Sequence, residues 1–321
     1  MPLTEPQLIA TPNNPTPPNA SVFAIRTADG RMLRAASFSP ARGAIGTVAL
    51  FQGRAEFIEK YFETINELLA RDFHVVTLDW RGQGGSERDL ADPRKGHVDD
   101  FALYQRDLDA FITDVLALAC PSPWYAMAHS MGGAILLDRA HSARSPFDRV
   151  IVVAPMIDFE GLRFPIGARA LADTLDMFGL GAMYVPGGGP QALNELPFEG
   201  NRLTSDAARF ARNADVLHAA PQLAVGDPTV GWANAAFRLM KQFAAPEYAR
   251  AVRTPVMAFL CGRDRIVSSR AIERFAQRLP VASLIEVPGA RHELLMERDE
   301  LREQFWTAFD AFVPGETVES A

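Results

Sequence analysis

One serine in this chain stands where a buried strand would end and a helix would begin. The apolar residues 125–128 lead into His129 and Ser130, and the segment 131–133 that follows contains two glycines. Such a sharp turn from strand to helix exposes the serine hydroxyl at the edge of a sheet. A serine hydroxyl attacks poorly until a base takes its proton, so this chemistry also requires a base, an acid that orients it and donors for the oxyanion.

The favoured candidate for the base among the six histidines is His292. It follows the predicted last strand, residues 283–287, and is therefore expected at the carboxyl edge of the sheet, where Ser130 also emerges. Position alone does not exclude His97, which stands in a polar loop. His74 is expected within a strand or at its start, and His141 and His218 are expected within helices. The side chain of His129, next to the serine, is expected to point away from it.

Two aspartates follow predicted strands in the second half of the chain. Asp264 comes directly after the strand predicted at 255–261, and the order Ser130, Asp264, His292 is that of a serine triad on a doubly wound sheet. The carboxylate would hold the imidazole in one tautomer and stabilise the imidazolium. Asp158, one strand earlier, is the alternative acid.

The oxyanion requires two backbone N–H groups that point at the developing charge. Met131 is expected to provide one of them from the first turn of a helix, where the helix dipole adds to the effect. The other is expected from the loop 52–56, with the N–H of Arg54 as the candidate donor. Gly53 would allow close backbone approach in this loop, although a plain turn glycine gives the same sequence signal.

The segments that position these residues alternate between strand and helix, which predicts an α/β fold with a doubly wound, mostly parallel sheet. The helix predicted at 56–71 has its charged residues opposite an apolar stripe. Strands are predicted at 21–27, 32–38, 47–52, 73–78, in the run that ends at Ser130, and at 150–154, 255–261 and 283–287. The other core helices are predicted at 98–119, 131–144, 269–278 and 293–312.

The alternation stops for about a hundred residues, too many for a loop in a compact domain. We therefore predict a core formed by residues 21–155 and 254–313, and an inserted helical cap formed by residues 156–253. Residues 1–20 contain six prolines and are predicted to be an extended arm laid across the surface, and residues 314–321 are predicted to be a polar tail.

Three segments resemble the α/β-hydrolase superfamily, and more narrowly the monoacylglycerol lipase and bacterial lysophospholipase group, which has a core of the serine aminopeptidase S33 type. Residues 52–57 are similar to the oxyanion segment of that group, residues 79–86 to its glycine-rich loop, and residues 128–133 to its nucleophile segment. The resemblance implies an α/β-hydrolase fold, with the acid and the base at the positions of Asp264 and His292.

Two residues depart from the pattern of this group. Ala128 stands where the first glycine of the nucleophile segment is usual, and its single methyl is expected to be tolerated. Gln52 stands where relatives often have histidine, which is expected to change how the loop is held without removing a backbone donor. The serine at the elbow differs from the aspartate of epoxide hydrolases and haloalkane dehalogenases and from the cysteine of dienelactone hydrolases, and it implies acyl transfer.

The predicted function is therefore that of a serine hydrolase that cleaves carboxylic esters through an acyl-enzyme, with a lysophospholipid or a monoacylglycerol as the favoured substrate. Flexible methionines and aromatic rings of the cap would suit an acyl chain, although a helical core that packs on itself would contain the same residue types. The pocket candidates are Met177, Phe178, Met183, Tyr184, Trp232 and Phe237. A peptidase or amidase with the same triad is one alternative, and a hydrolase-fold protein that binds a ligand without turning it over is another.

Composition bears on partners and location. The chain of 321 residues has a formal net charge of -7 and no dense Lys/Arg block, which disfavours nucleic acid as a partner. Cys120 and Cys261 lie far apart, and no metal-ligand spacing is present, so a reducing compartment and a reaction without metal or cofactor are expected. Neither a signal peptide nor an apolar run of about 18 residues is found. We predict a cytoplasmic protein whose cap makes at most weak peripheral contact with the inner membrane face, and we make no prediction of its oligomeric state.

Overall fold

The computed structural model describes residues 6–142, 144–162 and 164–313. The tail predicted at 314–321 and the first five residues of the predicted arm lie outside the described residues. Among the described residues, none of the helices combines the length and the apolar character that crossing a membrane requires.

A single eight-stranded sheet forms the centre of the described structure, with the strand order β1-β2-β4-β3-β5-β6-β7-β8. β2 is antiparallel to both of its neighbours, and the pairs from β4 to β8 are all parallel. The predicted doubly wound, mostly parallel α/β sheet is therefore confirmed. The strands are β1 (Ala20–Arg26), β2 (Met32–Phe38), β3 (Thr47–Phe51), β4 (His74–Leu78), β5 (Trp124–His129), β6 (Arg149–Val153), β7 (Val256–Cys261) and β8 (Ala282–Val287).

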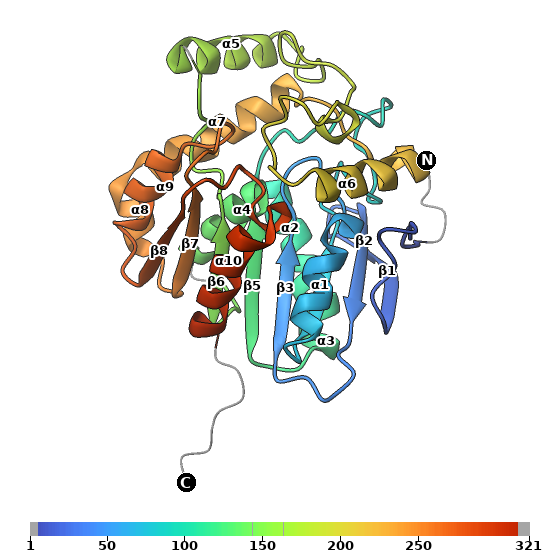
Figure 1. The fold of residues 1–321 in the computed structure, drawn as a ribbon. Coiled ribbons are helices and arrows are strands. Elements are labelled where there is room, and N and C mark those ends of the chain that lie inside the picture. Colours follow the sequence, from blue (N-terminus) through green and yellow to red (C-terminus); the bar gives the residue numbers. More distant parts are fainter. Residues whose placement is uncertain (1–5, 143, 163, 314–321) are drawn as a thin grey trace.

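Helices cover both faces of this sheet, which explains why its central strands are apolar without alternation. Every residue of β3 and of β7 is buried, as expected for parallel strands with helices on both sides. Figure 1 shows α1 and α10 in front of the sheet and α2 and α4 behind it. The helices of this core are α1 (Phe62–Leu69), α2 (Ala102–Phe111), α3 (Ala117–Ala119), α4 (Ser130–His141), α9 (Ser269–Ala276) and α10 (Asp299–Phe312).

Three of the core helices begin later than the apolar periodicity predicts. The first predicted helix starts as a 3₁₀ turn, η1 (Ile58–Tyr61), and its charged residues Glu59 and Lys60 are buried. The second begins at Ala102, where the side chain of Asp100 accepts the backbone N–H, and it continues through a π-helical turn, η2 (Ile112–Leu116). The last helix is preceded by a separate 3₁₀ turn, η5 (Leu294–Met296). Polar side chains that bind within the protein thus override the helical pattern at these starts.

The described part of residues 156–253, which we call the cap, contains helices and no strand. Figure 1 shows α5, α6 and α7 above one end of the sheet, with α5 outermost, and α8 beside α9 at the β8 edge. They are α5 (Pro165–Met177), α6 (Ala207–Ala219), α7 (Val230–Ala244) and α8 (Pro246–Ala251), with the short turns η3 (Leu193–Glu195) and η4 (Pro221–Leu223). Buried residues of α7 belong to the same hydrophobic cluster as the sheet. A smaller cluster joins α6 and the following turn to Phe57 of the core.

The described part of the N-terminal arm, residues 6–19, is bound to the core by hydrogen bonds. The backbone N–H of Ile9 donates to Oε1 of Glu59 over 3.1 Å, and Nδ2 of Asn14 donates to the carbonyl of the same glutamate over 2.8 Å. The side chain of Ile9 also packs against the smaller cluster beneath α6. The arm therefore contacts both the first 3₁₀ turn and the cap.

Candidate active site

Ser130 lies at the strand-to-helix turn between β5 and α4. Its φ of +49° is in the left-handed region, which a residue with a side chain rarely adopts. The preceding residue, His129, still has extended backbone, and α4 begins at the serine itself. This strained turn is the geometry of a nucleophile elbow, in which the serine hydroxyl is held at the end of the sheet.

His292 is the histidine that the structure places beside this serine. Its Nε2 lies 3.0 Å from Oγ of Ser130, and its Nδ1 lies 2.7 Å from Oδ2 of Asp264. Because a carboxylate only accepts, Nδ1 carries the proton, and Nε2 is left as the acceptor for the serine hydroxyl. This tautomer is the one that a base needs in order to take the proton of Ser130.

Asp264 is fixed in the orientation that this contact requires. Its Oδ1 accepts the backbone N–H groups of Ile266 and Val267 over 2.8 and 3.0 Å. Burial opposes ionisation, but His292 and these hydrogen bonds outweigh it, and the pKa of Asp264 is lowered from its ordinary value. The carboxylate is therefore ionised at neutral pH.

The two alternatives that the sequence left open have other partners. Oδ1 of Asp158 lies 3.1 Å from Nη2 of Arg169, so this carboxylate, at the start of the cap, pairs with α5. Nδ1 of His97 lies 2.8 Å from Oγ1 of Thr229, and its Nε2 lies 3.0 Å from Oδ1 of Asp99. Both ring nitrogens of His97 are thus engaged away from Ser130.

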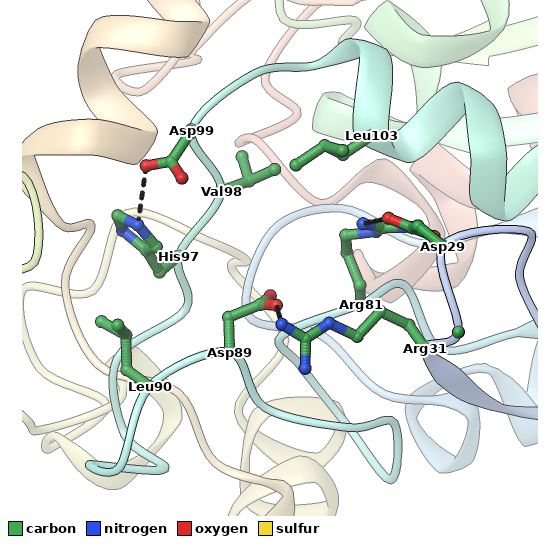
Figure 2. A pocket seen from close by; sticks show the side chains of 10 residues that line it. Asp29, Arg31, Arg81, Asp89, Leu90, His97, Val98, Asp99 and Leu103 are labelled. Carbon is green, nitrogen blue, oxygen red and sulfur yellow. Dashed lines mark hydrogen bonds and ion pairs between the residues drawn. The ribbon is translucent and has the colours of Figure 1, made fainter.

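His97 instead contributes to a polar cavity of about 380 Å³ beside the loop between β4 and α2. Figure 2 shows its charged walls, in which Arg31 pairs with Asp89 and Arg81 pairs with Asp29. None of the predicted triad residues lines this cavity.

Two backbone N–H groups near the elbow remain without acceptors. Within the described residues, neither the N–H of Arg54 nor that of Met131 donates a hydrogen bond. A Cβ added to Gly132 would lie 2.5 Å from the carbonyl oxygen of Gln52, so the segment after β3 packs directly on the start of α4. The segment that contains Arg54 therefore lies next to the first turn of α4, which contains Met131.

The oxyanion segment is held by a glutamine of the next glycine-rich loop. Nε2 of Gln83 donates to the carbonyl of Gly53 over 2.8 Å, and its Oε1 accepts the N–H of Ala55 over 3.1 Å. These bonds leave the intervening N–H of Arg54 free. The side chain of Gln52 has no part in this arrangement, because both polar atoms of its buried amide lack a partner among the described residues.

The side chain of Arg54 extends from this segment to the cap. Its Nη2 donates to the carbonyl of Gly226 over 2.8 Å, and its Cζ lies 5.1 Å from the centre of the Trp232 ring. Burial lowers the pKa of Arg54 to about 10, which leaves the guanidinium charged at neutral pH. The residue therefore links the oxyanion segment to α7 as well as presenting a backbone N–H.

A group of buried charges behind the elbow was not found by sequence reasoning. Oε1 of Glu56 lies 2.9 Å from Nζ of Lys60 and 3.0 Å from Nδ1 of His129, and the same Lys60 contacts Glu293. Oε2 of Glu56 accepts the hydroxyl of Tyr61. The available signal was the i, i+4 spacing of Glu56 and Lys60 next to a strongly apolar segment, but that spacing is also typical of a solvated helix face.

The structure does not bring the six pocket candidates together. Trp232 and Phe237 are buried and pack against Phe159, with ring centroids 6.5 and 5.6 Å from it. Met177 and Phe178 are 77% and 72% exposed, and Met183 is also exposed. Tyr184 is partly buried, and Nζ of Lys95 lies 5.2 Å from its ring centre. The six side chains thus lie in different surroundings, and the position of an acyl pocket stays a prediction.

In the part of the chain that the structure describes, no group of three or more His, Cys, Asp or Glu residues is arranged to hold a metal ion.

The sheet order, together with a serine at the turn from β5 to α4, defines this protein as an α/β-hydrolase. A family model described as serine aminopeptidase, S33, matches residues 43–299. The chain belongs to this family.

Individual relatives agree with this assignment. Lysophospholipase L2 of Escherichia coli strain K12 is 34% identical over 269 residues, which are 79% of this chain and 76% of that protein. A probable lysophospholipase L2 of Haemophilus influenzae is 27% identical over 82% of each chain. A crystal structure of a soluble variant of monoglyceride lipase from Saccharomyces cerevisiae, with a substrate analog, has the same fold, with a TM-score of 0.72 at 20% identity over 96% of each chain.

Proposed function

We propose that this protein hydrolyses carboxylic esters through an acyl-enzyme formed on Ser130. The observation that carries the proposal is the continuous contact from Asp264 through His292 to Ser130, with 2.7 and 3.0 Å between the paired atoms. Such a chain activates a serine that is otherwise a weak nucleophile.

In the proposed reaction, Oγ of Ser130 attacks the ester carbonyl carbon while Nε2 of His292 takes the hydroxyl proton. The N–H groups of Arg54 and Met131 stabilise the oxyanion of the tetrahedral intermediate. The imidazolium, held by Asp264, then gives its proton to the oxygen of the leaving alcohol. A water molecule attacks the acyl-enzyme in the reverse sequence of proton transfers and releases the carboxylic acid.

We further propose a lysophospholipid or a monoacylglycerol as the substrate. This is supported by relatives that carry the names lysophospholipase L2 and monoglyceride lipase, and by the apolar side chains that the cap contributes. Both lipids have a single acyl ester and a free hydroxyl, so one acyl site and one polar site would accommodate either.

The test compares purified protein on lysophosphatidylcholine, on monooleoylglycerol and on p-nitrophenyl esters of two to sixteen carbons. We expect turnover of at least one of the two lipids, and a kcat/KM on aryl esters that is maintained beyond four carbons. A sharp fall beyond about four carbons, with neither lipid cleaved, would contradict a lipid substrate.

The family description makes an aminopeptidase reaction the second candidate, since the same triad cleaves amides. Aminoacyl p-nitroanilides are therefore included in the panel. Faster turnover of these amides than of every ester would replace the ester proposal.

We also propose a cytoplasmic location and weak contact of the cap with a lipid surface. Both cysteines are unpaired, as expected in a reducing compartment. On the outermost part of the cap, Ile166, Met177 and Phe178 are 83%, 77% and 72% exposed (Figure 1). Replacement of these three residues by serine is expected to reduce co-sedimentation with phosphatidylcholine vesicles, and equal co-sedimentation of the wild type and the triple variant would contradict the contact.

A further inference from the structure

Both ring nitrogens of His129, the residue before the nucleophile, face hydrogen-bond acceptors. Nδ1 lies 3.0 Å from Oε1 of Glu56, and Nε2 lies 3.1 Å from the backbone carbonyl oxygen of His292. A carbonyl oxygen accepts only, so Nε2 must donate. A neutral imidazole has a single N–H and cannot also donate from Nδ1.

Glu56 is an ionised acceptor at this position. Its two oxygens receive hydrogen bonds from the backbone N–H of Gly53, from Nζ of Lys60 and from the hydroxyl of Tyr61. Although burial opposes ionisation, Lys60 and His129 hold the pKa of Glu56 well below its ordinary value. His129 is therefore left to donate from Nδ1 as well as from Nε2.

The charges around His129 balance when its ring is protonated. Two carboxylates, Glu56 and Glu293, share Lys60, and the exposed fraction of each of these side chains is 6% or less. With His129 as an imidazolium, two negative charges face two positive charges, whereas a neutral ring would leave one buried negative charge uncompensated. Burial alone would lower the pKa of His129, but Glu56 outweighs it, and the pKa is raised above its ordinary value.

The other groups near the ring of His129 include His292, in the loop after β8, and Cys261 of β7. The ring of His292 lies 4.7 Å from that of His129, centroid to centroid. The thiol of Cys261 contacts the same carbonyl of His292 over 3.8 Å, and burial raises the pKa of this thiol well above its ordinary value, so it stays neutral. Burial, together with Glu56, likewise raises the pKa of the neutral Tyr61.

We propose that His129 is a positioning residue that stays positively charged during turnover and joins the loop of the base to the segment of the oxyanion donor. The Nε2 bond fixes the backbone of His292. The Nδ1 bond holds Glu56, which in turn binds Gly53, the neighbour of Arg54. This inference rests on the proposed ester hydrolysis, because that reaction requires His292 and the N–H of Arg54 to be held in fixed positions relative to each other.

The kinetic test first removes the positive charge of His129 and then removes the negative charge of Glu56 as well, so that the buried charges balance again. His129→Gln keeps a donor for the carbonyl of His292 but leaves one excess negative charge beside that ring. We expect kcat to fall about 10- to 100-fold with a smaller change in KM, because the reacting groups are displaced. We also expect the acid limb of the kcat/KM profile to move about one pH unit upward or more, since nearby negative charge favours protonated His292.

The double variant H129Q/E56Q has no excess charge. Its acid limb is expected to return toward that of the wild type, even though kcat stays low. His218→Gln, at an exposed histidine of α6, is the matched control and should leave the profile unchanged. Identical acid limbs in the wild type, the single variant and the double variant would overturn the electrostatic part of the proposal.

A second measurement needs neither activity nor a His129 variant that folds. Nitrogen-15 spectra of the histidine rings in Ser130→Ala protein report the protonation of each ring nitrogen directly. We expect one ring, other than that of His292, to have both nitrogens protonated from pH 5 to pH 9. If no ring remains doubly protonated above pH 8, the proposal is wrong.

The two measurements also separate this inference from the proposed function. A wild type that cleaves no ester and does not react with a fluorophosphonate would refute the proposed function, while a doubly protonated ring would still support the charged state of His129. Active wild type whose buried histidines are all neutral at pH 8 would refute the inference alone.

Discussion

Asp264 holds His292 from one side only, through a contact of 2.7 Å between Oδ2 and Nδ1, while its other oxygen is fixed by two backbone N–H groups. Both oxygens of the carboxylate are thus engaged, and three hydrogen bonds hold its plane in place. The orientation of the imidazole, and with it the acceptor that faces Ser130, depends on this one side chain.

The first prediction concerns the acid. Asp264→Asn is expected to lower kcat about 10³- to 10⁴-fold, because an amide in this place favours the wrong tautomer of His292 and cannot stabilise the imidazolium. Steady-state kinetics on a short p-nitrophenyl ester measure the effect. Asp158→Asn is the matched control, since that carboxylate pairs with Arg169, and it should stay within about fivefold of the wild type. A larger loss from Asp158→Asn than from Asp264→Asn would reverse the assignment.

The second prediction concerns the packing of the oxyanion segment. Gly132→Ala would place a methyl 2.5 Å from the carbonyl oxygen of Gln52, and because both groups are backbone-fixed the segment must move. We expect kcat to fall about 10- to 100-fold, with a far smaller change in KM. Gly167→Ala in α5 serves as the control, since its added methyl would meet only an ordinary contact at 3.7 Å. Full activity of Gly132→Ala would show that the oxyanion donor does not depend on this contact.

The third prediction separates the two parts of Arg54. Arg54→Ala keeps the backbone N–H but removes the contacts with Gly226 and Trp232. Loss of about 1 kcal/mol of cation–π energy corresponds to roughly a fivefold effect, and we expect it mainly in kcat/KM for long-chain esters, which depend on the cap. Turnover of p-nitrophenyl acetate should change little. An equal loss on acetate and on palmitate would mean that the side chain acts at the oxyanion itself.

The fourth prediction concerns stability and pH. Glu63 of α1 pairs with Arg209 and Arg212 of the cap and with Arg302 of α10. Although burial opposes it, these arginines lower the pKa of Glu63 from 4.5 to about 2. A lowered carboxyl pKa stabilises the folded state fully above the unfolded pKa, and this stabilisation is lost as the pH falls through the folded pKa.

Glu63→Gln should therefore destabilise the protein at pH 7, and the difference from the wild type should shrink between about pH 4.5 and about pH 2. Urea unfolding across this range provides the measurement. Glu303→Gln, at an exposed position of α10, is the control and should have no effect at any pH. A destabilisation by Glu63→Gln that does not depend on pH would contradict the electrostatic account.

The positions of Ser130, Asp264 and His292 could be predicted because each follows a strand. Parallel strands present their carboxyl ends at one edge, so residues 134 and 28 positions apart along the chain converge there. The mostly parallel pairing of the strands likewise follows from the alternation of apolar strands and amphipathic helices. The same logic placed the oxyanion segment, residues 52–56 after β3, at this edge.

The contacts of Lys60 and the packing of the cap could not be predicted in this way. Lys60 and Glu293 are 233 positions apart, and no local pattern indicates that two buried charges will meet. Trp232 and Phe237 could be chosen from the sequence as pocket candidates, but residue type does not tell which surface covers them. Trp232 proves to pack on Phe101 of the core and on Phe159 at the start of the cap, while Met177 and Phe178 stay exposed.

The central claim is that Ser130 is the nucleophile. Its most direct test is reaction of the wild type, Ser130→Ala and His292→Ala with a fluorophosphonate, followed by mass spectrometry of the labelled peptides. We predict a stoichiometric adduct on Ser130 in the wild type, none in Ser130→Ala, and labelling slowed at least about 100-fold in His292→Ala. Equal labelling of the wild type and Ser130→Ala, or an adduct on another residue of the wild type, would contradict the account.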